Sequence, residues 1–186
     1  MDRSRRPPRP LRHEIQDVLG DGQDVTKVSL SRLQKMDSFI KESQRLNTIA
    51  LATSRRVTTQ DIHLSGGHII PSGTQTSLPA FDQLNDVPNP DVFDGFRYYR
   101  MRKESPENEN KYQYVESGKK NLYWGYGRHA CCGRFFASDE IKCLLVCVLR
   151  GYDLKLPEGM GRPENWLLDW KIIPNIDAII MMRKAA

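Results

Sequence analysis

The sequence predicts a mainly α-helical fold with small β-sheets, which places it in the α+β class. Two stretches, 29–46 and 134–150, repeat apolar residues at helical spacing. Between and after them lie short runs of branched side chains, separated by glycine and proline turns. The chain has 186 residues, a length that suits one domain with a sizeable core and is hardly enough for two.

The first helix is expected over residues 29–46. Its apolar positions are Leu30, Leu33, Met36, Ile40 and Leu46, with Phe39 beside them. Ser31 with Gln34 matches a capping box, and Ser29 is a competing N-cap. The sequence therefore leaves two candidate N-caps for this helix, Ser29 and Ser31.

The segment that follows has the character of a small sheet. Short strands are expected at 57–64, 68–70 and 74–78, joined by turns at 65–67 and 71–73. Residues 79–123 are irregular, with four prolines and a polar stretch at 104–111. So long a loop-rich region is typical of a functional segment or of one with a partner packed over it.

The second helix is expected over residues 134–150 and ends at Gly151, a natural C-terminal stop. Its apolar positions are Phe136, Ala137, Ile141, Leu144, Leu145 and Val148. Cys143 and Cys147 lie one helical turn apart and are expected to be buried core thiols. A loop with two prolines and two glycines follows, and residues 170–173 and 178–182 are predicted as closing strands.

The formal net charge is +5, and much of it lies at the N-terminus. Residues 1–9 form a basic tail in which arginines alternate with prolines, and residues 10–186 form the folded region. We interpret the tail as a solvated leader stiffened by proline, so no nucleic-acid partner is expected. The alternative is nucleic-acid binding through phosphate neutralisation, which predicts salt-dependent retention that is lost when the tail is deleted.

The sequence predicts an intracellular setting. The arginine-rich start is not followed by an apolar stretch, so no signal peptide is expected, and the longest apolar run, 143–149, is too short to span a bilayer. The four cysteines crowd into the last third of the chain, which is not typical of a secreted disulfide framework. A zinc site built from them would lack the usual Cys-x-x-Cys spacing.

The chemistry is expected in a glycine-rich loop just before the second helix. This stretch reads Trp124-Gly125-Tyr126-Gly127-Arg128-His129-Ala130-Cys131-Cys132-Gly133-Arg134-Phe135-Phe136-Ala137. A cysteine at a helix N-terminus is stabilised as a thiolate, because the helix dipole and free backbone N–H groups favour negative charge. Glycines on either side let the backbone fold around the sulfur and aim donors at it, which tunes a bound metal.

The stretch resembles the haem-binding signature of cytochromes P450, aromatic-Gly-x-Gly-x-(His/Arg)-x-Cys-x-Gly-(Arg)-x-x-Ala. Trp124 stands where phenylalanine is usual in that signature. Cys131 is the aligned cysteine, because Gly127 precedes it by four residues and Gly133 follows it by two, whereas choosing Cys132 breaks both spacings. The resemblance implies that Cys131 is the axial ligand of haem b iron, in a cofactor-binding loop that includes Trp124, Gly127 and Gly133.

Two further segments resemble the same family. Glu42-Ser43-Gln44-Arg45 resembles its Glu-x-x-Arg motif, and 93–97 resembles the fungal form of the segment whose arginine joins that pair. The resemblance implies a buried triad of Glu42, Arg45 and Arg97 that fixes the cysteine loop. One carboxylate between two guanidiniums satisfies charge and many donors at once. Taken alone, Glu42 with Arg45 would be read as a surface i,i+3 pair.

The family also holds the haem propionates with basic side chains. The resemblance assigns this role to His129, two residues before the cysteine, and to Arg56 at the start of the predicted sheet. His63 and His68 are read as sheet and turn residues rather than ligands.

The resemblance runs from about Pro10 to the end and covers the C-terminal portion of the cytochrome P450 fold, less than half of it. The N-terminal half, the long distal oxygen-activating helix and the relatives' endoplasmic-reticulum membrane anchor are not matched, so no catalytic residue is assigned. A cytoplasmic location is therefore compatible with the sequence. The stretch 81–90 looks shortened against the usual pattern, which leaves the strand register there open.

By family, the expected function is haem-thiolate monooxygenation, an oxidoreductase reaction at C–H bonds of a small hydrophobic molecule. The motifs have residues typical of fungal members of the family, which suggests secondary metabolism and a terpenoid, indole-diterpenoid or polyketide substrate. By family, electrons would come from an NADPH-dependent cytochrome P450 reductase. Two alternatives stay open. In the first, the chain is an inactive remnant or a truncated gene model. In the second, it is a haem-binding or reductase-interacting module without oxygenase activity.

Overall fold

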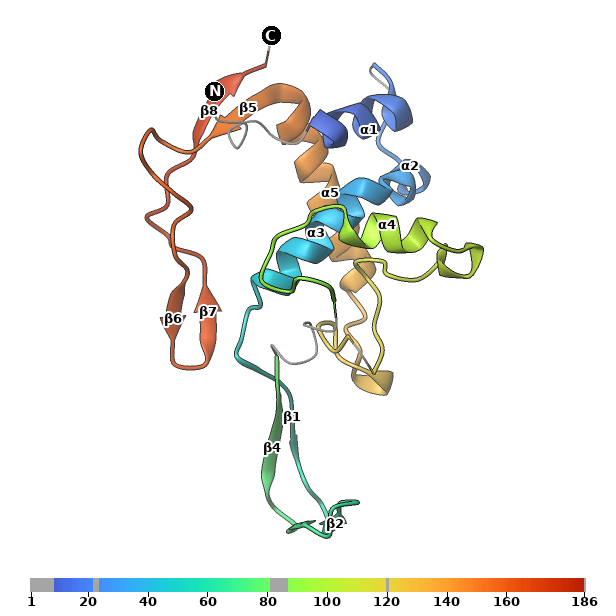
Figure 1. Cartoon of the computed structure of the whole chain (residues 1–186), viewed down its shortest axis with the longest axis vertical. Helices are drawn as coiled ribbons and strands as arrows, with labels where there is room; N and C mark the ends of the chain where they lie inside the picture. Colours follow the sequence, from blue (N-terminus) through green and yellow to red (C-terminus); the bar gives the residue numbers. More distant parts are fainter. Residues whose placement is uncertain (1–8, 22–23, 81–86, 120, 186) are drawn as a thin grey trace.

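The structure, a computed structural model, describes residues 9–21, 24–80, 87–119 and 121–185. Helices gather into one body, and strands extend from it as two-stranded arms (Figure 1). The predicted mixture of helices with small β-sheets is therefore confirmed. Residues 1–8 of the expected basic tail and residues 81–86 of the shortened stretch lie outside the described residues.

The helices are α1 (Arg9–Leu19), α2 (Lys27–Arg32), α3 (Gln34–Leu46), α4 (Arg97–Lys103) and α5 (Arg134–Gly151), with short 3₁₀ turns at Pro106–Asn108 and Gly127–His129. The strands are β1 (Ala52–Val57), β2 (Ile62–His63), β3 (Ile69–Ile70), β4 (Gln75–Pro79), β5 (Tyr152–Lys155), β6 (Trp166–Leu168), β7 (Lys171–Ile173) and β8 (Met181–Lys184). They pair antiparallel as β1–β4, β2–β3, β5–β8 and β6–β7.

The apolar core lies where α1, α2, α3 and α5 meet. Apolar residues recur every third or fourth position on α1 and α3, so one stripe of each helix faces the others. The buried members of this core are Leu11, Ile15, Leu19, Leu30, Leu33, Met36, Ile40, Tyr114, Val146 and Leu149. Segments far apart in the chain, from α1 to α5, therefore contribute to a single core.

The single helix predicted over 29–46 is two helices, and neither predicted cap is used as expected. Thr26 caps α2, since its side chain accepts from the Ser29 backbone N–H at 3.2 Å while the Ser29 hydroxyl accepts from the Thr26 N–H at 2.9 Å. The chain then breaks at Leu33, whose ψ of 69° is not helical. The Thr26 cap was missed because Ser29 and Ser31 lie nearer the apolar stripe.

The second helix, α3, begins against a carboxylate supplied by α1. The Glu14 carboxylate accepts the backbone N–H groups of Lys35 at 2.6 Å and Met36 at 2.9 Å. Burial raises the pKa of Glu14, although these two hydrogen bonds act in the opposite direction. A cap that comes from a helix some twenty residues earlier leaves no local sequence signal, which is why the break was not predicted.

Strand boundaries also differ from the prediction. The branched run 57–64 contains only the end of β1 and all of β2, and β1 extends back to Ala52 through an irregularity between Thr53 and Arg56. Ser54 has a φ of 52° at this irregularity, a conformation that short hydrogen-bonding residues adopt at a bulge. The closing strands predicted at 170–173 and 178–182 are β7 and, shifted along the chain, β8.

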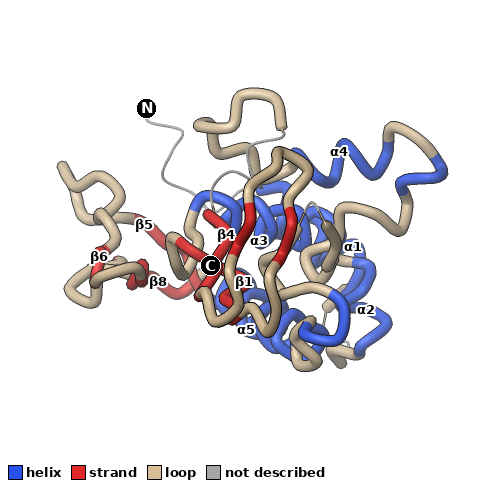
Figure 2. The backbone as a smooth tube through the Cα atoms, turned by 90° about the horizontal axis from the view of Figure 1, so that it is seen from below, coloured by secondary structure: helices blue, strands red, loops and turns tan. Residues whose placement is uncertain are grey.

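Residues 49–51 join two of the arms. The Leu51 N–H donates to the Trp170 carbonyl at 2.8 Å, and the Leu51 carbonyl accepts from the Ala80 N–H at 2.9 Å. Ile49 contacts the β6–β7 hairpin through the Ile172 N–H at 3.0 Å. The strand pairs β1–β4 and β6–β7 are thus held to one segment that follows α3. Seen from below, β1 and β4 lie in front of the helices and β6 lies to their left (Figure 2).

Two cysteine positions correct the prediction of core thiols. Cys147 is exposed, and Cys143 is only partly buried. The inward face of α5 consists instead of Ser138, Lys142, Val146 and Leu149. Two of these four residues are polar. Of the predicted apolar positions, Ile141 and Leu145 pack against the core, whereas Phe136 and Leu144 are exposed.

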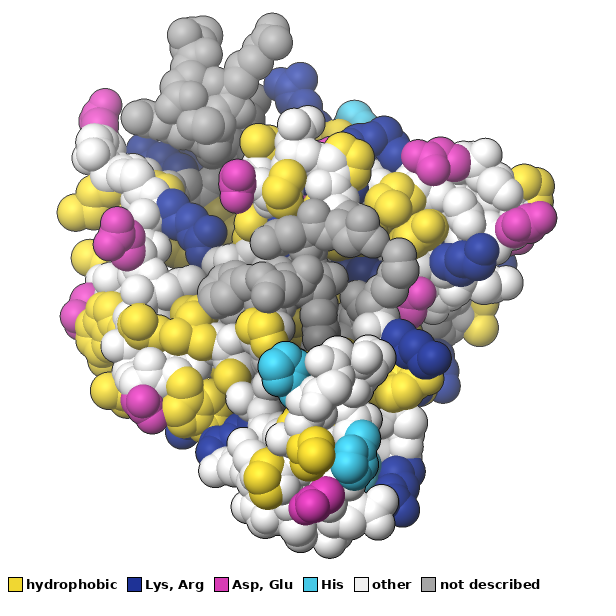
Figure 3. All heavy atoms as spheres, turned by 60° about the horizontal axis from the view of Figure 1, so that its bottom comes forward, with side chains coloured by type: hydrophobic (Ala, Val, Ile, Leu, Met, Phe, Trp, Pro, Cys, Tyr) yellow, Lys and Arg dark blue, Asp and Glu magenta, His cyan; other side chains and the backbone are white. Residues whose placement is uncertain are grey.

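Apolar side chains are exposed along the C-terminal arms. Figure 3 shows hydrophobic side chains gathered on the side of the molecule where the β6–β7 hairpin lies, and Leu167 and Leu168 there are 63% and 64% exposed. Ile176, in the segment leading to β8, is 74% exposed. Across the described parts of the chain, no helix is both long and apolar enough to cross a membrane.

Candidate functional site

The cysteine loop is closed by backbone hydrogen bonds. The Gly125 N–H donates to the Leu122 carbonyl at 2.8 Å, and the Cys131 N–H donates to the Trp124 carbonyl at 2.6 Å. The 3₁₀ turn Gly127–His129 lies between these two bonds. The residues on either side of the turn are therefore brought back against each other just before α5.

The glycines of this loop differ in how strictly the structure requires them. Gly125 has a φ of +76°, and a Cβ there would lie 2.5 Å from the His129 carbonyl oxygen. Gly127 also has a positive φ, +59°, with open space around it. At Gly133 a Cβ would lie 4.0 Å from the Cys131 sulfur, which is ordinary contact. Gly125, which was not among the predicted site residues, is therefore the most restricted of the three.

Cys131 is exposed and lies two residues before the N-cap of α5. The N-cap of this helix is Gly133, which has no side chain to satisfy the first-turn N–H groups. Arg134 fixes the turn, because its guanidinium donates to the Cys131 carbonyl at 2.8 Å and to the Val115 carbonyl at 3.2 Å. An accessible sulfur therefore lies beside free backbone donors and the positive end of an 18-residue helix dipole.

Trp124 anchors the loop to the core. Its indole N–H donates to the Tyr114 carbonyl at 2.8 Å, and its ring packs edge-on against the Tyr114 ring with centroids 5.3 Å apart. This predicted cofactor-binding residue is thus turned toward the protein interior and holds the loop in place.

Glu42, Arg45 and Arg97 are in mutual contact and almost completely buried, with 0%, 3% and 6% exposure. Arg45 donates two hydrogen bonds to the Glu42 carboxylate, at 3.0 and 2.9 Å. Arg97 donates to both oxygens of the same carboxylate at 3.3 Å. The structure therefore has the buried triad geometry rather than a surface i,i+3 pair.

The Glu42 carboxylate stays charged in this setting. Burial alone would raise its pKa, but hydrogen bonds from Arg45 and from the Asp94 backbone N–H, with the charges of Arg45 and Arg97, lower the pKa below its ordinary value. The hydrogen bond to Glu42 in turn raises the pKa of Arg45.

The triad fixes the segment before α4. Arg97 donates to the carbonyls of Pro88, Asn89 and Val92, and the Asp94 N–H donates to Glu42 at 3.0 Å. Among the described residues, none of the triad's hydrogen bonds reaches residues 114–133. The structure thus gives the triad no direct bond to the cysteine loop, and other residues connect that loop to the core.

A pocket of about 490 Å³ lies next to the loop. It is lined by Thr48, Ile49, Ala50, Ala52, Thr53, Ser54, Arg55, Arg56, Ala80, Leu122, Tyr123, Gly125, His129 and Trp170. The pocket brings together Arg56 and His129, the two residues predicted to hold propionates, from β1 and from the 3₁₀ turn. His63 and His68 are exposed in the β2–β3 hairpin and do not line it.

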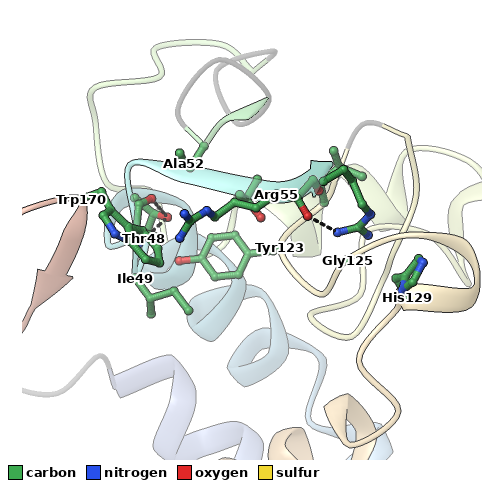
Figure 4. A pocket seen from close by; sticks show the side chains of 14 residues that line it. Thr48, Ile49, Ala52, Arg55, Tyr123, Gly125, His129 and Trp170 are labelled. Atoms are coloured by element: carbon green, nitrogen blue, oxygen red, sulfur yellow. Dashed lines mark hydrogen bonds between the residues drawn. The ribbon is translucent and has the colours of Figure 1, made fainter. Parts of the chain in front are cut away.

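Arg55, Tyr123 and Trp170 are among the lining residues that were not predicted from the sequence. Arg55 reaches between Trp170 and Tyr123, with its guanidinium 4.8 Å from the Trp170 ring centroid (Figure 4). The Tyr123 hydroxyl donates to the Asn47 carbonyl at 3.0 Å, and burial raises the pKa of Tyr123. These residues come from β1, the β6–β7 turn and the loop before Cys131, so no local pattern could have joined them.

The side chains that line this pocket suit a ligand that is partly anionic and partly apolar. Arg55, Arg56 and His129 supply donors on a pocket whose other walls are largely apolar. Within the parts of the chain that the structure describes, no three His, Cys, Asp or Glu side chains are arranged to hold a metal ion by themselves.

Known proteins resemble this chain over nearly its whole length. The profile of the cytochrome P450 family matches residues 8–172. A cytochrome P450 monooxygenase of Emericella nidulans is 42% identical over 178 residues, which cover 94% of this chain and 33% of the relative. An ent-kaurene oxidase of Gibberella fujikuroi is 43% identical over 182 residues, covering 94% of this chain and 36% of the relative.

Among solved structures, the haem domain of cytochrome P450DA has a similar fold. The TM-score is 0.72 at 21% identity, and the match covers 96% of this chain and 37% of that one. The chain thus spans about a third of the length of the relatives that it matches.

Proposed function

Because this chain belongs to the cytochrome P450 family, we propose that Cys131 is the axial thiolate ligand of a haem b and that the chain is the haem-binding part of a fungal monooxygenase. The observation that carries this proposal is the position of Cys131. Cys131 is exposed and lies on a constrained glycine loop, two residues before an uncapped helix N-terminus, and Gly125 and His129 of the same loop line a pocket with cationic side chains.

The residues present fit such a group. Cys131 supplies the thiolate, and the N–H groups at the start of α5 stabilise its charge. Arg56 and His129 are the residues that would hold the carboxylates of the propionates, and Arg55 on the same wall adds a further donor. Apolar side chains of the pocket, such as Ile49 and Leu122, suit the porphyrin ring.

When bound, the haem supplies the activation of dioxygen and the transfer of one oxygen atom to a C–H bond. The chain's own residues position it. Gly125 and Trp124 set the shape of the loop that presents Cys131, and the buried triad holds the segment leading into α4. The Cys131 thiolate and the hydrogen-bond donors around it would set the reduction potential of the iron.

The substrate that we propose is a small hydrophobic molecule of fungal secondary metabolism. One relative is named as an ent-kaurene oxidase, which supports a terpenoid. The fungal-type residues of the motifs are equally compatible with an indole-diterpenoid or a polyketide. We further propose that electrons come from an NADPH-dependent cytochrome P450 reductase.

The carbon monoxide difference spectrum of the reduced, hemin-supplemented chain tests the ligand. We expect a Soret band of the thiolate-ligated type, abolished by Cys131→Ala and retained by Cys132→Ala. Cys132 is a matched control because it is the adjacent cysteine and is also exposed. A thiolate-type band that survives Cys131→Ala, or that disappears only with Cys132→Ala, would refute the assignment. The absence of any such band in the unsubstituted chain would refute haem binding by this chain alone.

A further inference from the structure

A second buried charge cluster lies on α3, separate from the triad. The Asp37 carboxylate accepts from the Lys142 ammonium of α5 at 2.6 Å and from the Tyr114 backbone N–H at 2.8 Å, and the Arg102 guanidinium of α4 lies 3.7 Å away. Asp37 and Lys142 are each 5% exposed, and Arg102 is 8% exposed. Three elements therefore meet at one carboxylate, and sequence patterns indicated none of these contacts.

One set of contacts leads from Asp37 to the residues before the cysteine. The Tyr114 N–H donates to Asp37, and the Tyr114 carbonyl accepts from the Trp124 indole N–H at 2.8 Å. The Trp124 carbonyl in turn accepts from the Cys131 N–H at 2.6 Å. Three hydrogen bonds in series thus connect the Asp37 carboxylate to the backbone of Cys131.

The other contact leads to the residues after the cysteine. Lys142 lies two turns along α5 from Arg134, the first residue of that helix. Since a helix is rigid over this distance, the ion pair between Lys142 and Asp37 sets where the N-terminus of α5 stands. Asp37 therefore holds the backbone on both sides of Cys131.

Lys41, one turn further along α3, also binds the segment that contains Tyr114. The Lys41 ammonium donates to the Glu116 carboxylate at 2.7 Å and to the Gln113 carbonyl at 3.1 Å. Burial lowers the pKa of Lys41, while the charge of Glu116 and its hydrogen bond act in the opposite direction. Asp37 and Lys41 thus clamp residues 113–116, whereas the Glu42 triad on the same helix binds residues 88–94.

We propose that Asp37 is a positioning residue for Cys131. It fixes the cysteine loop through Tyr114 and Trp124 and fixes α5 through Lys142. This inference rests on the proposed function, because the position of Cys131 matters for a haem ligand, which must be held at a set place. Its geometry needs no haem, so it can be tested independently.

Two double variants of the full chain test this role without leaving the Lys142 ammonium unpaired, and Arg102 loses its contact with the Asp37 charge equally in both. Asp37→Asn with Lys142→Met removes the ion pair but keeps an oxygen that accepts the Tyr114 N–H. Asp37→Ala with Lys142→Met removes both. The readout is the Trp124 indole N–H resonance in ¹⁵N-tryptophan-labelled protein, assigned by substituting each of the three tryptophans in turn.

We expect the Trp124 resonance of the Asn variant to stay near its unsubstituted position, with slow hydrogen exchange. In the Ala variant the resonance should move, and its exchange should become faster on the order of tenfold. Glu42→Gln is the matched control, because it alters a buried carboxylate on the same helix that does not bind Tyr114. Its native-state Trp124 resonance should not move. Identical Trp124 resonances and exchange rates in the two double variants would overturn the proposal.

A second readout separates this proposal from the haem assignment. After hemin addition, the Ala variant should give a smaller thiolate-type carbon monoxide band than the Asn variant. If the unsubstituted chain takes up no haem, the proposed function fails while the Trp124 resonance still decides the role of Asp37. If haem binds with equal thiolate bands in both variants, the contact of Asp37 with Tyr114 does not position Cys131.

Discussion

Replacing Glu42 with glutamine is expected to lower the free energy of unfolding by about 3–5 kcal/mol, the usual cost of removing one partner from a buried ion pair. Glu42 is 0% exposed and neutralises two guanidiniums, those of Arg45 and Arg97. A glutamine amide retains one acceptor oxygen but carries no charge. Both arginines would then be buried without a counter-ion, and the Asp94 N–H would compete for the remaining oxygen.

Urea unfolding followed by circular dichroism measures this effect, with Glu140→Gln as the control. Glu140 is an exposed glutamate on α5, so its replacement should change the unfolding free energy by no more than about 0.5 kcal/mol. Equal stabilities for the two variants would show that the triad does not hold the segment before α4.

The same carboxylate gives a pH dependence of known sign. The pKa of Glu42 is lowered in the folded chain from its ordinary value of 4.5. Its contribution to stability is therefore fully present above that value and is lost as the pH falls through the folded pKa. Glu14, whose pKa is raised by burial, works in the opposite direction. The loss of stability on acidification should thus be smaller in Glu42→Gln than in the unsubstituted chain, which urea titrations at several pH values would measure.

The second large effect is expected for Gly125→Ala. The added Cβ would lie 2.5 Å from the His129 carbonyl oxygen, and the residue would also keep a φ of +76°. The left-handed conformation alone costs about 1–2 kcal/mol. Since the clash is with backbone rather than with a flexible side chain, the loop must also move, and we expect a total loss of about 2–4 kcal/mol.

Gly159→Ala is the matched control for this prediction. Gly159 has the same φ of +76° but nothing within 4 Å of its added Cβ, so only the conformational cost of about 1–2 kcal/mol applies. The difference between the two variants, measured by urea unfolding, isolates the contact with His129. Gly125→Ala should also weaken the thiolate-type haem band, whereas Gly159→Ala should not. Equal losses of stability would mean that the loop tolerates a side chain at Gly125.

Parts of this fold were predictable because the information was local. The helix after the cysteine and the turns between the small strands follow from residue spacing, and α5 begins and ends where the pattern placed it. α4 was missed for a physical reason. It presents Arg97 and Arg102 to the interior, so buried ion pairs hold it and no apolar stripe marks it. α1 was not predicted either, since only its first residue, Arg9, fell in the basic tail and its short apolar stripe of Leu11, Ile15 and Leu19 was not recognised.

The candidate site divides in the same way. The order of residues in the loop determines that Cys131 precedes a helix, and family resemblance paired Glu42 with Arg97 across the chain. The Asp37 cluster and the contact of Arg55 with Trp170 depend on residues that folding brings together from distant segments. A carboxylate in the middle of a helix, such as Asp37, looks like any solvated residue until its partners are known.

The core described above has a consequence for the order in which the chain can fold. Leu11 and Ile15 of α1 pack in one cluster with Val146 and Leu149 of α5, and the Arg150 guanidinium bonds the Gly20 carbonyl across 130 residues. During synthesis, α1 emerges from the ribosome long before α5 exists. Residues of α2 and α3 can cover part of its apolar face soon afterwards, but its contacts with α5 can form only once that helix has emerged.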